Sequence, residues 1–303
     1  MKNITPAQLE LVKEVKISEL LRGSTDERHE ASGVHFKDGY LHIVFDNDPC
    51  IARLGVDLSP AAQEHVLIRQ RGEGVGYEDL TFQPLERHWY CLIEASEYAP
   101  GVFKARVEEF DEGFQFIKSH WLDFPIKNPN KGIEGLSYLH YRGENYLLGL
   151  CEGNACKSGA LGREPGKGRI LLFKRSDRQW EYHGMIKLPK TVLFEDYAGL
   201  DVRGGKIAVV SQASSALWVG KIRPDPPNLS EVFDGDGYIF QFPRDAKGRI
   251  VYCNIEGVTW VGDGSVVVVS DRAKPESQPS RCAHKDQSVH IFQLPDDFHL
   301  AGS

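Results

Sequence analysis

The chain has 303 residues, of which 41% are hydrophobic and 26% are charged, and these proportions are ordinary for a globular protein. Its formal net charge of −7 argues against broad nucleic-acid binding, which depends on an excess of Lys and Arg. No apolar run approaches the roughly 20 residues that a membrane-spanning helix needs, and the amino-terminal sequence lacks the apolar core of a secretory signal. We therefore expect a cytoplasmic protein with neither nucleic-acid nor membrane partners.

The cysteines are scattered and form no Cys-X-X-Cys motif. In a reducing compartment such cysteines are free thiols that pack in the interior. The sequence therefore predicts free thiols, with a regulatory pair between Cys151 and Cys156 as the alternative. The six positions are Cys50, Cys91, Cys151, Cys156, Cys253 and Cys282.

The first predicted element is a strand at residues 11–20 (LVKEVKISEL), where apolar and polar residues alternate. A six-residue motif then recurs along the chain. Its third residue is Gly in four of five copies, and its fourth residue is Leu or Val in all of them. The copies are ASGVHF at 31, YEDLTF at 77, IEGLSY at 133, YAGLDV at 197 and IEGVTW at 255.

Each copy of the motif is followed by a short turn and an apolar, β-rich run, such as YLLGLC or VVVVS. Strand, short turn and strand together indicate a β-hairpin, and a further amphipathic strand follows each one. The copies start 46 to 64 residues apart, and strand-built repeats of this size are typical of a β-propeller. We predict an all-β fold with one β-propeller domain over residues 1–303, with five blades as the first interpretation and six as the alternative.

Closure of the ring gives a check on this prediction. The fifth repeat ends near residue 294 with its third strand, so a fourth strand is missing at the carboxyl end. The amino-terminal strand can supply it, which would remove exposed sheet edges. We therefore expect the amino-terminal strand to join the last blade.

The geometry of a propeller brings two sets of polar residues to one end of its axis, because each first strand starts where each second strand ends. Converging carboxylates repel one another, and a proton or a cation relieves the repulsion. Oxygen ligands favour Ca²⁺, with Mg²⁺ or another divalent cation as alternatives. The alternative without a metal is that the carboxylates accept backbone N–H groups at blade junctions. The set near the axis is Ser32, Glu78, Glu134, Ala198 and Glu256, and the set one step further out is Asp46, Glu94, Glu152, Gln212 and Asp271.

Two long basic loops, at residues 155–169 and 271–287, follow acids of the outer set. Long loops on a rigid scaffold often carry function, and cations beside a metal would suit an anionic ligand. The candidate substrate-binding residues are Arg163, Arg169 and Arg272. The partner that we expect is a small anionic molecule, with a protein partner as the alternative, and ordinary solvated loops are the plain interpretation.

The units IEGLSY…LLGLCEGN and IEGVTW…VVVVSDR resemble the Glu-Gly-(Leu/Ile) repeat of the esterase-like-phytase and SdiA-regulated propeller families. More distantly, they resemble the SMP-30/gluconolactonase/paraoxonase group. The resemblance covers about residues 30–296 as a pattern, and it implies calcium on the axis and, in some members, hydrolysis of phosphate esters or lactones. By position, it implies Glu78, Glu134 and Glu256 as metal-side acids and Glu152 and Asp271 as second ligands or bases. The chain departs from a complete acid ring at Ser32 and Ala198.

The function that we predict is a Ca²⁺-dependent hydrolase of a small anionic ester, phosphoester or lactone. The metal ligands would be Glu78, Glu134, Glu256, Asp46 and Glu94. Glu152 or Asp271 would act as the catalytic base.

Two other functions compete with a hydrolase that uses a metal. One is a propeller without catalysis that binds a ligand or a protein, with a structural cation or none. The other is a glycosidase, which needs opposed carboxylates and sugar-stacking aromatic residues. Because the loops near the acids are poor in Trp and Tyr, we rank the glycosidase last.

Overall fold

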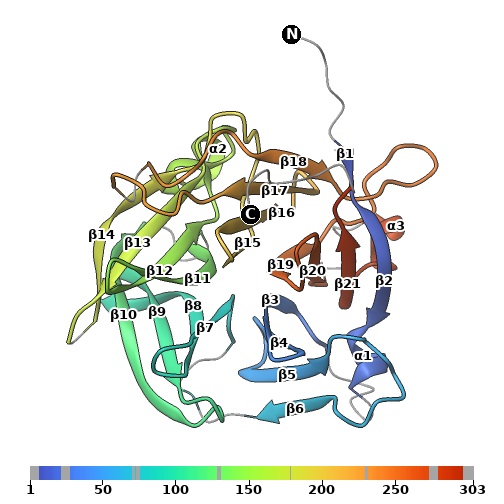
Figure 1. The fold of residues 1–303 in the computed structure, drawn as a ribbon, viewed down its shortest axis with the longest axis horizontal. Helices are drawn as coiled ribbons and strands as arrows, with labels where there is room; N and C mark the ends of the chain where they lie inside the picture. The colour runs from blue at the N-terminus through green and yellow to red at the C-terminus, as the bar shows by residue number, and fades with distance from the viewer. Residues whose placement is uncertain are drawn as a thin grey trace.

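The computed structural model describes residues 7–21, 28–69, 72, 76–127, 131–177, 179–228, 231–272 and 279–295. Strands make up 54% of the described residues and helices 6%, and the predicted all-β propeller is confirmed. Antiparallel meanders surround a central axis, with β3, β7, β11, β15 and β19 innermost (Figure 1). No helix in the described ranges is long and apolar enough to cross a membrane.

The meanders follow one another along the chain and each runs from the axis outward. The first has β3 (Ala31–Lys37), β4 (Tyr40–Phe45), β5 (Cys50–Gly55) and β6 (Val66–Arg69). The second has β7 (Leu80–Gln83), β8 (His88–Ala99), β9 (Val102–Phe110) and β10 (Phe116–Ile126). The third has β11 (Ile133–Tyr141), β12 (Glu144–Cys151), β13 (Arg169–Arg175) and β14 (Trp180–Lys187). The fourth has β15 (Gly199–Arg203), β16 (Lys206–Ser211), β17 (Ala216–Lys221) and β18 (Tyr238–Gln241). The last has β19 (Ile255–Trp260), β20 (Ser265–Ser270) and β21 (Ser288–Gln293).

The amino-terminal segment closes the ring as predicted. Strand β2 (Glu10–Lys16) pairs antiparallel with β21, from Glu10 opposite Gln293 to Lys16 opposite Ser288. Strand β1 (Ala7–Gln8) pairs in parallel with β18, so this segment ties the fourth meander to the last one. The predicted strand at 11–20 was too long, because a short helix, α1 (Ile17–Leu20), follows β2. A short parallel pairing of β10 with β14 joins the second and third meanders into one eight-stranded sheet.

The glycine at the third position of the motif allows neighbouring inner strands to approach closely. A Cβ atom added to Gly199 would lie 2.4 Å from the carbonyl oxygen of Glu256. One added to Gly257 would lie 2.8 Å from the backbone nitrogen of Val34. Real side chains do not fit at such distances, so the motif requires Gly wherever two inner strands touch through backbone.

We expect the substitution Gly199→Ala to lower the free energy of unfolding by roughly 1–3 kcal/mol, because the methyl group overlaps rigid backbone atoms. Gly262→Ala is the matched control, since a Cβ atom there meets nothing within 4 Å. Urea denaturation followed by tryptophan fluorescence measures both changes. Equal stability of the two variants would contradict the packing role of the motif glycine.

The fifth residue of the motif links an inner strand to its neighbour in four of the five copies. In four copies its side-chain oxygen accepts a hydrogen bond from the backbone N–H of the sixth residue in a neighbouring copy. Inner strands expose backbone donors that no further strand pairs, and these bonds satisfy them. The bonds run from Tyr138 to Thr81 at 3.0 Å, from Val202 to Ser137 at 3.1 Å, from Trp260 to Asp201 at 2.9 Å and from Phe36 to Thr259 at 3.1 Å.

The hydrophobic core lies between adjacent meanders and contains most of the tryptophans. Trp89, Trp180, Trp218 and Trp260 are each at most 1% exposed. They pack between sheets, so they do not offer the stacking platform that a sugar-binding surface needs.

The cysteines differ from the main prediction. Disulfides join Cys151 to Cys156 and Cys253 to Cys282, whereas Cys50 and Cys91 are buried and form no disulfide. The prediction of free thiols is therefore wrong for four residues, and the alternative pair of Cys151 and Cys156 is present. The sequence could not reveal the other bond, because the fold brings Cys253 to within 5.7 Å (Cα to Cα) of Cys282, which lies in α3 (Ser280–Ala283).

Candidate functional site

The carboxylates of the motif and those after the second strands gather at one end of the axis. Glu134 and Glu256 are the second residues of β11 and β19, and Glu78 lies just before β7. Glu152 and Asp271 directly follow β12 and β20. Backbone bonds fix these strand ends, since Tyr197 N–H donates to Glu152 O at 2.9 Å and Asp271 N–H to Asn254 O at 2.9 Å.

Two groups of three carboxylates converge at this end. Ligand oxygens of Glu94, Glu134 and Glu152 all lie within 4.8 Å of one another. Those of Glu30, Asp46 and Asp271 do the same. The structure therefore brings together most of the acids that the sequence singled out, and it adds Glu30.

Two acids near this end, Glu30 and Asp196, were missed by the sequence analysis. Each stands immediately before its copy of the motif, and these are the two copies that have Ser32 or Ala198 at the second position. Alternate residues of a strand point to the same side, so an acid two positions earlier can serve the same face. The sequence does carry this signal, and every repeat contributes an acid to this end of the fold.

Burial and mutual repulsion favour the neutral forms of these acids. Burial, together with Glu94, Asp271 and Glu152, raises the pKa of Glu78 to about 8. Burial and then Asp271 raise the pKa of Asp46 to about 8. Burial followed by neighbouring carboxylates also raises the pKa values of Glu134 and Glu256 well above the usual range. Without a cation, several of these groups therefore carry protons near neutral pH.

Some of the acids also accept hydrogen bonds, as the interpretation without a metal expected. The backbone N–H of Gly132 donates to Glu94 Oε1 at 2.6 Å, and Gln212 Nε2 donates to Glu256 Oε1 at 3.1 Å. Lys131 donates to Glu152 Oε1.

Several buried carboxylate oxygens at this end have no such partner, and Asp46 Oδ1 is one of them. Glu152 Oε2 and Asp271 Oδ1 make no hydrogen bond to any residue that the structure describes. A buried oxygen without a partner is costly, so a proton or a cation is expected there. The donor set consists of oxygens alone, which fits Ca²⁺ better than zinc.

A pocket of about 550 Å³ opens beside these acids. Glu152, Asp196 and Gln212 line it, together with cations that include Lys157 and Arg163 from the loop around α2 (Gly159–Gly162). Of the three predicted arginines, Arg163 lines this pocket, whereas Arg169 and Arg272 do not. Arg169 instead donates through Nη1 to the carbonyl oxygen of its neighbour Gly168 at 2.8 Å. The lining cations are Lys131, Lys157 and Arg163.

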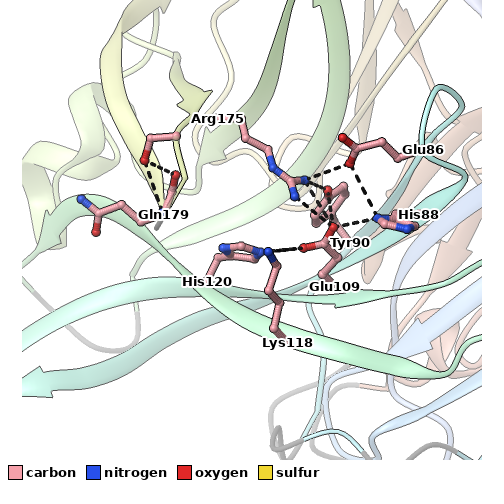
Figure 2. A network of polar contacts seen from close by, with 9 residues as sticks. Glu86, His88, Tyr90, Glu109, Lys118, His120, Arg175 and Gln179 are labelled. Carbon is pink, nitrogen blue, oxygen red and sulfur yellow. Dashed lines mark hydrogen bonds and ion pairs between the residues drawn. The ribbon is translucent and has the colours of Figure 1, made fainter.

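A second titratable cluster surrounds Glu109 between the second and third meanders (Figure 2). Its carboxylate accepts from several donors, and these outweigh the effect of burial, so that the pKa of Glu109 falls to about 2. The donors are His88 Nδ1 at 2.7 Å, His120 Nε2 at 2.6 Å, Tyr90 Oη at 3.0 Å and Arg175 Nη2 at 3.2 Å.

The Glu109 cluster has the composition of a metal site but not its electrostatics. Ligand atoms of Glu86, His88 and Glu109 lie within 4.8 Å of one another. However, the guanidinium of Arg175 lies 3.4 Å from Glu86 Oε2 and 3.2 Å from Glu109 Oε1 and pairs with both carboxylates. A cation would have to displace this arginine, so we interpret the cluster as an ionic contact that holds the second and third meanders together. We call it the Glu109 clasp.

Comparison with known proteins identifies the fold and no family. No family model matches the chain, and no curated protein matches its sequence. The glutaminyl cyclase of Myxococcus xanthus superposes with a TM-score of 0.53 at 12% identity, over 96% of this chain and 100% of that one. CoXyl43, a GH43 β-xylosidase/α-arabinofuranosidase from a compost microbial metagenome, has a TM-score of 0.53 at 9% identity over 96% and 97% of the two chains. The RS223 β-xylosidase has a TM-score of 0.53 at 11% identity, over 96% of this chain and 97% of its own. At such identities the likeness extends to the fold alone.

Proposed function

We propose that the acidic end of the axis binds a divalent cation, Ca²⁺ before Mg²⁺, and that the protein uses it to hydrolyse a small anionic ester, phosphoester or lactone. The observation that carries this proposal is the buried Glu152 Oε2, which lacks a partner among the described residues and belongs to a residue that also lines the pocket. A cation held by Glu94 and Glu134, beside Glu152, would polarise an ester or phosphoryl oxygen.

The residues around the pocket have distinct roles in this proposal. Arg163 and Lys157 would hold the anionic part of the substrate, since both line the pocket together with Glu152. Glu152 is the favoured base, because burial raises its pKa while the bond from Lys131 opposes that rise. Asp271 stays the second candidate base, although it does not line this pocket. Glu78, Glu256 and Asp46 complete the acidic surroundings of the cation.

Glu152→Gln is expected to lower kcat by about 100-fold or more, because it removes the general base. Arg163→Gln is expected to raise KM with less effect on kcat, because it removes binding that is equal in the ground and transition states. Glu164→Gln is the matched control, since Glu164 is an exposed acid of the same loop. The mono-nitrophenyl ester of succinate, nitrophenyl phosphate and a small lactone that carries a carboxylate, each with added Ca²⁺ or Mg²⁺, are the substrates to test.

A binding module without catalysis is the second candidate. The bonds from Gly132 to Glu94 and from Gln212 to Glu256 favour it, because they give two of the acids a structural use. If Ca²⁺ stabilises the protein but none of the three substrates turns over, this candidate replaces the hydrolase.

The two disulfides bear on the expected cytoplasmic location. Such bonds persist in oxidising compartments and are rare in the cytosol. They therefore favour an oxidising compartment over the reducing one that the sequence suggested.

A further inference from the structure

The opposite end of the axis contains a second cavity, of about 440 Å³, which shares no lining residue with the pocket beside Glu152. It lies at the ends of the inner strands β3, β7 and β15 and beside the middle of β11. Cavities of about 300–1,000 Å³ are the usual size of small-molecule sites. The residues that line it bear hydrogen-bond donors and aromatic rings, and the carboxylate among them, Asp38, is exposed and paired with Lys37.

Four side chains supply the hydrogen-bond donors. They are His35 on β3, Thr81 on β7, Ser137 on β11 and Arg203, the last residue of β15. Thr81 and Ser137 are 1% and 2% exposed and line the cavity. Each hydroxyl oxygen accepts a backbone N–H of the next inner strand, and neither hydroxyl hydrogen is donated to a residue in the described parts of the chain. His35 also lines the cavity, and its ring makes no side-chain hydrogen bond within the described ranges. Arg203 completes the set.

Arg203 is the lining cation of this cavity that forms no ion pair with a described residue. Its guanidinium lies 5.1 Å from the centroid of the Phe36 ring and donates through Nη2 to the carbonyl oxygen of Phe36. No carboxylate of a described residue lies within ion-pair distance of it. A guanidinium has five N–H donors, so most of the donors of Arg203 are available to a ligand.

The other charges near the cavity already have partners. Lys37 binds both Asp38 and Glu112, and Glu112 also binds Arg87. Asp201 lies two residues before Arg203, and its Oδ2 accepts from Thr259 Oγ1 and from the N–H of Trp260, both at 2.9 Å. Burial, then Arg203 and Lys37, lower the pKa of His35 to about 3, so its ring is neutral and offers one N–H donor. A single arginine is therefore left to face an anion, which suits a ligand with one negative charge.

The aromatic walls define the rest of the ligand. The rings of Phe36, Phe82 and Tyr138 line the cavity beside Arg203 and the two hydroxyl groups. Flat apolar surfaces next to a guanidinium fork match a flat apolar body that carries one carboxylate. A phosphate monoester carries about two charges at neutral pH and would need a second cation that is not already paired.

We propose that this cavity is a binding site for a small aromatic or flat apolar monocarboxylate, held by Arg203, His35, Thr81 and Ser137. The site is independent of the cation and of hydrolysis at the other end of the axis. It gives the molecule two chemically opposite ends, one rich in acids and one that binds an anion.

Isothermal titration calorimetry with benzoate tests the site, with benzamide as the uncharged probe of the same shape. We expect benzoate to bind, and benzamide to bind about tenfold or more weakly, because it lacks the charge that the arginine recognises. Arg203→Gln should weaken benzoate binding by about tenfold or more. Arg142→Gln is the matched control and should bind benzoate as the parent protein does, since Arg142 is an exposed arginine that also follows an inner strand and already pairs with Asp225.

Several results would overturn the proposal. They are no saturable binding of benzoate at millimolar concentration, equal affinity for benzoate and benzamide, or loss of binding in Arg163→Gln instead of Arg203→Gln. Circular dichroism verifies that each variant is folded. The comparison of benzoate with benzamide on the parent protein needs no variant, so it decides even if Arg203→Gln fails to fold.

Discussion

Calcium is expected to raise the melting temperature of this protein far more at about pH 8.5 than at about pH 6. Burial and neighbouring acids raise the pKa values of Glu78 and Asp46 to about 8 in the folded protein. A carboxyl group with a raised folded pKa gives stability that is present below its unfolded pKa and is lost as pH rises through the folded pKa. In the absence of a cation, stability should therefore fall between about pH 4.5 and pH 8.

A bound cation reverses this trend, because it replaces the protons that relieve the repulsion. At low pH the cation must displace protons from the carboxyl groups, whereas at high pH these groups are already ionised. The affinity for the cation therefore rises with pH. At a free concentration of 100 times its dissociation constant, the cation would add about 2.7 kcal/mol to the free energy of unfolding. Differential scanning calorimetry with EDTA, and then with Ca²⁺, Mg²⁺, Mn²⁺ or Zn²⁺, measures the effect at each pH.

Two variants decide whether the effect belongs to the acidic end. Glu134→Gln should abolish the response to Ca²⁺, because Glu134 belongs to the group with Glu94 and Glu152. Glu164→Gln, which alters an exposed acid, should leave the response intact. A calcium response that is equal at both pH values, or one that survives Glu134→Gln, would place the cation elsewhere. No response at all would leave the acids to share protons and would remove the main support for the proposed hydrolase.

The fold was predictable because the motif repeats along the chain with strand periodicity. The alternation in residues 11–20 was enough to predict ring closure, although not where α1 would begin. The close approach of Gly199 to Glu256 and the link from Thr81 to Tyr138 were not foreseen, because they join different copies of the motif through space. Periodicity within one strand predicts which of its side chains are buried. It does not predict which residues of the neighbouring strand those side chains contact.

The acidic end was predicted in outline for the same reason. Strand starts and ends fix which residues share one end of the axis, and this placed Glu134, Glu152 and Glu94 together. Glu30 and Asp196 were missed because the copies of the motif were aligned on their shared glycine. They were not aligned by which side of the strand each residue faces. The cavity at Arg203 was missed because its donors, taken one at a time, are ordinary polar residues. The fold alone brings them to one place.

The clasp around Glu109 has large consequences for stability. Glu109 lies on β9, and its partner Arg175 is the last residue of β13 in the neighbouring meander. The side chain of Glu109 is 1% exposed, and that of Arg175 is 23% exposed. Removing Glu109 leaves the charge of Arg175 to Glu86 at 3.4 Å and takes a shared acceptor from His88 and His120, and the loss of one member of a buried ion pair is costly.

Glu109→Gln is therefore expected to lower the free energy of unfolding by roughly 3–5 kcal/mol. Glu112→Gln is the matched control, because Glu112 follows closely in sequence and pairs with Lys37 and Arg87 at the surface, where ion pairs contribute little. The low folded pKa of Glu109 adds a test by pH. Its contribution is present above its unfolded pKa and is lost as pH falls toward about 2, so the difference between Glu109→Gln and the parent protein should shrink in acid. Urea denaturation at about pH 7 and at about pH 3 measures that difference. If Glu109→Gln is as stable as Glu112→Gln at neutral pH, the cluster is not a clasp, and its histidines and carboxylates would have to be examined again as a metal site.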